Sequence, residues 1–167
     1  MAGERERTQM VHRWKDQAAF QAISQEIRTL ENDRAAAIVA VAMLEYALVL
    51  AIEAHCSPMS NPKRKKLEEK SLGDLITTAN TKGVIDQQAT DHLHILRKIR
   101  NEFAHDMNPL SFTSEKIFPL CEDLPVPNYL DGGATLEEPT DTNQRMRRRF
   151  IEMTYFQLLL LIGDLEG

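Results

Sequence analysis

The sequence is poor in the residues from which metal sites, disulfide frameworks and sheet proteins are built. It has two cysteines, Cys56 and Cys121, which lie far apart and outside any CxxC spacing, so we expect neither a zinc site nor a disulfide framework. Two reduced thiols are typical of a cytoplasmic protein, and the sequence contains no motif for a metal or another cofactor. Seven glycines and seven prolines are too few for an all-β protein that turns about every ten residues.

Positive charge is scarce as well. The 20 basic residues are outnumbered by 25 acidic ones, which leaves a net charge of −5. A domain that binds DNA on its own usually carries a basic excess, because contacts to phosphate supply most of the affinity. Specific DNA binding by this chain alone is therefore not expected, while contact with RNA stays open. The sequence has two basic clusters that could contact a nucleic acid, and each is more typical of a solvated face. One is Lys63, Arg64, Lys65 and Lys66, and the other is a row that includes Arg145 and Arg148.

We also expect no secretion signal and no membrane anchor. Residues 1–16 are charged, without the apolar stretch of a secretion signal, and we expect residues 1–10 to form a flexible tail. The longest apolar stretch, residues 35–52, contains Glu45 and is short for a membrane span. We therefore expect a helix buried in protein, no association with membranes and a cytoplasmic location.

What the sequence does have is helical periodicity, in a length of 167 residues that suits a single domain. The residues Asn32, Ser71 and Asp86 are good N-caps. The fold class expected is all-α, a compact bundle of about five helices near residues 11–30, 33–55, 72–82, 86–105 and 141–165, with a further short helix between 111 and 122. Prolines make residues 56–70 a loop or the start of an exposed helix, and residues 124–140 an irregular loop.

Two charged residues lie on apolar helix faces. Glu45 falls within the most apolar predicted helix, and Arg100 lies on the same stripe as Leu96, Ile99 and Phe103. A carboxylate in an apolar environment is costly unless it is paired. We therefore predict that Glu45 and Arg100 form a buried ion pair between two helices.

Arg100 is also part of a second candidate site, with Asn101 and His105. A neutral histidine can accept the proton of a ribose 2′-hydroxyl, and an arginine can hold the phosphate and stabilise its developing charge. Together they are suited to RNA cleavage without a metal. On a regular helix, however, Arg100 and His105 lie about 140° apart, so the helix must distort near Ala104 or two chains must pool their residues. The structural alternative is a helix-end histidine bonded to the backbone and an arginine paired with a carboxylate.

The stretch Ile95–Asp106, with the sequence ILRKIRNEFAHD, resembles the mannitol operon repressor family. The resemblance extends over about residues 32–162. Further matching pieces are Asp33-Arg34-Ala35-Ala36-Ala37-Ile38, Leu44-Glu45, Leu72-Gly73, Gly83-Val84-Ile85, Leu110-Ser111-Phe112 and the arginine-led helix from Arg145. The family is all-helical and regulates transcription of mannitol genes without an obvious helix-turn-helix. The resemblance implies a transcriptional regulator that acts through a protein partner.

The Arg-Asn…His pattern also resembles the wider HEPN superfamily, which implies a HEPN-like bundle. Many HEPN members are metal-independent ribonucleases that act as dimers, while others bind RNA or protein without catalysis. Carried over, Arg100 and His105 would be the catalytic pair, Asn101 their neighbour, and the chain a homodimer. The second hypothesis is therefore a metal-independent endoribonuclease.

Overall fold

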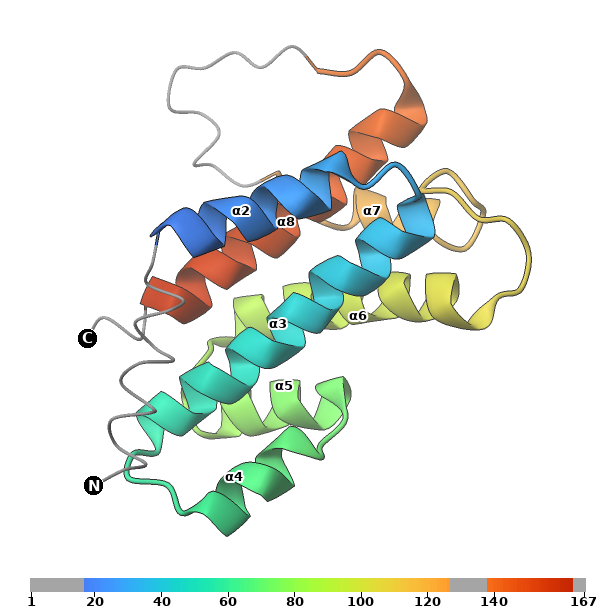
Figure 1. Cartoon of the computed structure of the whole chain (residues 1–167). Coiled ribbons are helices and arrows are strands. Elements are labelled where there is room, and N and C mark those ends of the chain that lie inside the picture. Colours follow the sequence, from blue (N-terminus) through green and yellow to red (C-terminus); the bar gives the residue numbers. More distant parts are fainter. Residues whose placement is uncertain (1–16, 127–137, 164–167) are drawn as a thin grey trace.

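Helices form all of the regular structure in residues 17–126 and 138–163, which the computed structural model describes (Figure 1). They are α2 (Gln17–Thr29), α3 (Asp33–His55), α4 (Asn61–Glu68), α5 (Leu72–Thr81), α6 (Gln87–His105), α7 (Phe118–Glu122) and α8 (Thr142–Gly163). The predicted all-α class is confirmed. The predicted tail at 1–10 and most of the predicted loop at 124–140 lie outside the described residues.

Helix α3 is the central helix of the bundle and packs against α8, α6 and α5 (Figure 1). It begins at Asn32, whose side-chain oxygen accepts a hydrogen bond from the N–H of Ala35 at 2.9 Å. By length and composition α3 could cross a membrane, but 61% of its apolar window is buried inside the fold. It is therefore best described as the core helix that the sequence predicts.

Helices α5 and α6 begin where their caps are predicted. The hydroxyl of Ser71 accepts from the N–H of Asp74 at 3.1 Å, and the carboxylate of Asp86 accepts from the N–H of Ala89 at 2.8 Å. Between the helices, Gly83 has a φ of +73°, a left-handed conformation that glycine adopts without steric cost. Contacts within a few residues thus determine where α5 and α6 begin and how the chain turns between them.

Two short helices raise the number above the five that were expected. Helix α4 lies within residues 56–70, so the second prediction for that stretch, an exposed helix start, is the correct one. Pro62 lies in the first turn of α4, where its missing N–H and fixed φ are tolerated. Helix α7 confirms the short helix expected between residues 111 and 122.

Candidate functional site

The C-terminal end of α6 carries the residues of the predicted ribonuclease site. Arg100 and Asn101 are half-buried, and His105 is exposed. The helix stays regular to His105, and the N–H of Asp106 still donates to the carbonyl of Glu102 at 3.2 Å. The distortion that would turn Arg100 and His105 toward each other is therefore absent from this helix. Within one chain the two side chains leave α6 in different directions, as its geometry requires.

The turn after α6 is held in place from the start of α3. One guanidinium nitrogen of Arg34 donates to the carbonyl oxygens of Asp106 at 2.8 Å and Asn108 at 2.7 Å. The carboxylate of Asp106 accepts from the backbone N–H and the side-chain amide of Asn108, both at 2.9 Å. The backbone bond is the largest cause that holds the pKa of Asp106 below its usual value, with help from the charges of Lys116 and Arg34. This turn presents Met107, which is 92% exposed.

The predicted ion pair between Glu45 and Arg100 does not form. No salt bridge among the described residues joins them, although α3 and α6 pack together. Both side chains are half-buried rather than buried. Water can therefore solvate each charge, and the penalty that motivated the prediction does not arise.

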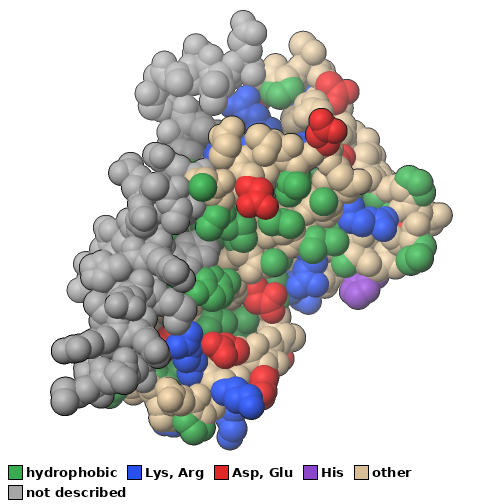
Figure 2. All heavy atoms as spheres, viewed as in Figure 1, with side chains coloured by type: hydrophobic (Ala, Val, Ile, Leu, Met, Phe, Trp, Pro, Cys, Tyr) green, Lys and Arg blue, Asp and Glu red, His purple; other side chains and the backbone are tan. Residues whose placement is uncertain are grey.

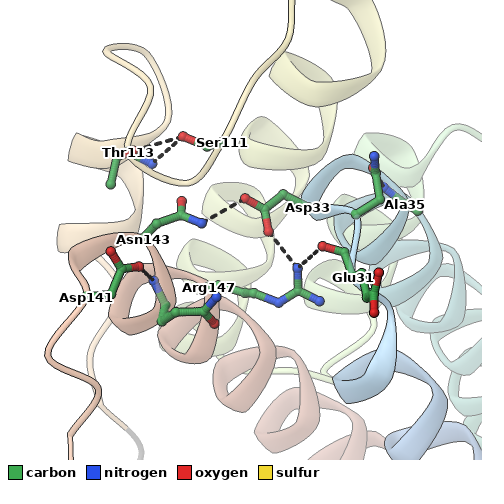
Figure 3. A network of polar contacts seen from close by, with 10 residues as sticks. Glu31, Asp33, Ala35, Ser111, Thr113, Asp141, Asn143 and Arg147 are labelled. Atoms are coloured by element: carbon green, nitrogen blue, oxygen red, sulfur yellow. Dashed lines mark hydrogen bonds and ion pairs between the residues drawn. The ribbon is translucent and has the colours of Figure 1, made fainter.

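A buried ion pair exists instead at the junction of α3 and α8, between Arg147 and Asp33 (Figure 3). The guanidinium of Arg147 lies 2.6 Å from the Asp33 carboxylate and 3.2 Å from the carbonyl of Glu31. The side-chain amide of Asn143 donates to the other oxygen of Asp33 at 3.0 Å. Both members of the pair are largely shielded, with side-chain exposures of 9% for Arg147 and 13% for Asp33. The network joins the two helix starts.

The basic cluster on α4 is only partly available to a ligand. Lys63, Lys65 and Lys66 are exposed. Arg64 is half-buried, and its Nε lies 3.0 Å from the carboxylate of Glu68 and 3.5 Å from that of Glu53. Arg64 thus links α4 to the end of α3. The three lysines are the residues of this cluster that remain as candidate contacts to a nucleic acid.

The arginine row of α8 is divided between structural and exposed positions. Arg147 belongs to the junction above, and Arg149 donates to the carbonyl of Glu122 at the end of α7 at 3.4 Å. Arg145 is exposed and lies 3.3 Å from the hydroxyl of Thr142, while Arg148 is half-buried. Arg147 and Arg149 therefore tie α8 to neighbouring elements.

An exposed apolar surface lies on α3 between residues 35 and 46 (Figure 2). Ile38 is 38% exposed and Tyr46 40% exposed, and Ala42 between them is also exposed. Half-buried Ala35 and Glu45 share this helical row. We call these five residues the α3 face.

Other residues with reactive or metal-binding side chains do not gather into a site. The described residues contain no group of three or more His, Cys, Asp or Glu side chains that could hold a metal ion. Burial lowers the pKa of His92, whose Nδ1 lies 3.4 Å from the Gln157 amide, and burial also lowers the pKa of His94. Burial raises the pKa of the Cys121 thiol to about 12, so this thiol is unreactive near neutral pH.

Comparison with known proteins finds a likeness in structure. No protein-family model matches the chain, and no curated protein matches it in sequence. A chain in the X-ray structure of the MtlR–HPr complex from Escherichia coli has a similar fold, with a TM-score of 0.60 and 20% sequence identity. The match covers 90% of this chain and 100% of that one. The chain therefore has an MtlR-like fold.

Proposed function

We propose that this chain is a cytoplasmic regulator of the mannitol operon repressor type, which acts by binding a protein partner. One observation carries the proposal: the chain shares its fold, over 90% of its length, with a chain from a complex of MtlR with HPr. The exposed α3 face agrees with a role in binding protein. HPr itself is the first partner to consider.

Calorimetric titration of the purified chain with purified HPr tests the proposal directly. Binding that saturates at a fixed stoichiometry is the expected result, and native electrophoresis should show the same complex. If the two proteins remain separate at the highest soluble concentrations, HPr is not the partner.

The regulator we propose does not read DNA by itself. Its net charge is −5, and the structure commits Arg64, Arg147 and Arg149 to contacts within the fold. In a gel-shift assay at physiological salt, the purified chain should bind duplex DNA weakly and without sequence preference. A tight shift specific to one operator, with no other protein present, would contradict this.

Ribonuclease activity is the second candidate, favoured by the solvent access of His105 and Arg100 at the end of α6. Because these side chains diverge on a regular helix, the activity requires a two-fold homodimer in which one chain supplies the arginine and the other the histidine. The expected signs are a dimer in light scattering and cleavage of single-stranded RNA in the presence of chelator. The variant His105→Ala should then be inactive yet folded. RNA that stays intact, or a chain that stays monomeric, removes this candidate.

A further inference from the structure

The two halves of α3 differ sharply in burial. From Ala47 to Glu53 every residue is buried. Before this stretch, Ile38, Ala42 and Tyr46 form an exposed row at a spacing of four residues, which places them on one side of the helix. Figure 2 shows hydrophobic side chains gathered on the surface over α3. In the part of the chain that the structure describes, these side chains of α3 therefore keep apolar surface open to solvent.

Glu45 is the charged residue of this surface. It lies one position before Tyr46 and seven after Ile38, and it is half-buried. Among the described residues no hydrogen bond or ion pair reaches its carboxylate, including from Arg100 on the neighbouring helix. When the α3 face is covered, water leaves and this carboxylate needs a cation.

A second copy of the chain does not meet that need. In a two-fold pairing whose axis passes near Glu45, the two Glu45 carboxylates would approach each other, because a residue at the axis meets its own copy. Two carboxylates would then be buried together without a cation, and each chain already carries a net charge of −5. Electrostatic complementarity favours a different protein that carries positive charge.

We propose that the α3 face is the docking surface for the protein partner, and that the partner presents a lysine or arginine within an apolar patch, which pairs with Glu45. This inference rests on the proposed function, since it describes how the partner is bound. The apolar row supplies the buried area, and Glu45 sets the register of the partner.

The test is calorimetric titration with purified HPr of the full chain and of two matched pairs of variants. Glu45→Gln removes the carboxylate with little change of shape, and Glu26→Gln does the same at an exposed site on α2. Ile38→Asp places a charge on the α3 face, and Met107→Asp places one on the turn after α6. Circular dichroism confirms that each variant is folded.

We expect Glu45→Gln to weaken binding by at least about tenfold, because it strands the partner's cation, and Ile38→Asp to weaken it at least as much. Glu26→Gln and Met107→Asp should leave the affinity unchanged. If HPr binds all five proteins equally, the inference is overturned while the proposed function stands. If HPr does not bind the unaltered chain, the choice of HPr as partner fails, and a second measurement decides the inference.

That measurement is site-specific photo-crosslinking in cells, with a benzophenone side chain in place of Ala42 or, as control, of Met107. The inference predicts an adduct from position 42 with another protein, absent from position 107 and lost when Glu45→Lys is added. The peptide crosslinked to position 42 should contain lysine or arginine among apolar residues. An adduct of the chain with itself, an adduct that survives Glu45→Lys, or no adduct at position 42 overturns the inference.

Discussion

Arg147 and Arg100 occupy similar sequence settings but opposite structural ones. Arg147 lies in the same helical row of α8 as Phe150 and Ile151, and its guanidinium binds Asp33 and the carbonyl of Glu31 at a shielded junction. Arg100 lies beside the buried stripe of α6, yet it is half-buried and has no ion pair among the described residues. Arg147 therefore links two helices through a shielded ion pair, whereas Arg100 is partly open to solvent.

The two arginines differ because different polar groups lie next to α8 and to α6. The first turn of α3 brings Asp33 to the start of α8, so that a carboxylate, a carbonyl and an amide converge on one guanidinium (Figure 3). At the end of α6, the carbonyl oxygens of the following turn accept hydrogen bonds from Arg34. Arg100 and His105 therefore keep their hydrogen-bonding capacity for water or a ligand. The junction of α3 and α8 is a shielded ion pair, whereas the end of α6 leaves these two side chains accessible to solvent.

The largest effect should come from Arg147→Ala. This change leaves the shielded carboxylate of Asp33 without its cation, and we expect the free energy of unfolding to fall by about 3–5 kcal/mol. Urea denaturation followed by far-UV circular dichroism measures it. Arg145→Ala, an exposed position in the same row, is the control and should change stability by less than about 0.5 kcal/mol. Equal losses of stability in the two variants would show that the ion pair between Arg147 and Asp33 does not stabilise the fold more than an exposed arginine does.

The second effect, at the end of α6, should come from Arg34→Ala. The carbonyl groups of Asp106 and Asn108 lose their donor, and because both are close to solvent we expect a cost of about 1–2 kcal/mol. Hydrogen exchange should quicken in residues 106–108 and not at the junction that contains Arg147. Exchange that rises equally at both regions would mean that Arg34 supports the whole bundle.

Elements that depend on nearby residues were predictable from the sequence. The caps Asn32, Ser71 and Asp86 act within three residues of themselves, and Gly83 sets a turn by its own backbone angle. Helix α4 was harder, because a proline in a first helical turn and a proline in a loop look alike without the rest of the turn.

Contacts between distant residues were not predictable in the same way. The rule that a charge on an apolar face needs a partner was sound, but its application to Glu45 and Arg100 required knowing how α3 and α6 cross. The same rule applied to Arg147, seven residues before Thr154 and three before Phe150 in a buried row, would have identified a buried pair. Its partner Asp33, which is 114 residues away in sequence, could come only from the tertiary structure.

A smaller effect is expected from pH at the turn after α6. The bonds from Asn108 hold the pKa of Asp106 below its usual value of 3.8, so the carboxylate stabilises the turn fully above that value. The stabilisation is lost as the pH falls through the lowered pKa. The amide resonance of Asn108 should shift with this transition in a pH titration by nuclear magnetic resonance, and Asp106→Asn should abolish the shift. A shift centred above pH 3.8 would contradict the proposed cause.

The smallest effect is expected from the pair that did not form, Glu45 and Arg100. If each charge is solvated separately, Glu45→Gln and Arg100→Ala should change the free energy of unfolding independently. The double variant should then equal the sum of the single ones within about 0.5 kcal/mol. Urea denaturation of the four proteins gives this coupling energy, and a parallel cycle with Asp33→Asn and Arg147→Ala supplies the positive control, where strong coupling is expected. A coupling of about 3 kcal/mol between Glu45 and Arg100, the scale of a broken buried pair, would mean that the two charges meet in solution. Glu45 would then have its cation within the chain, and the α3 face would no longer require one from a partner.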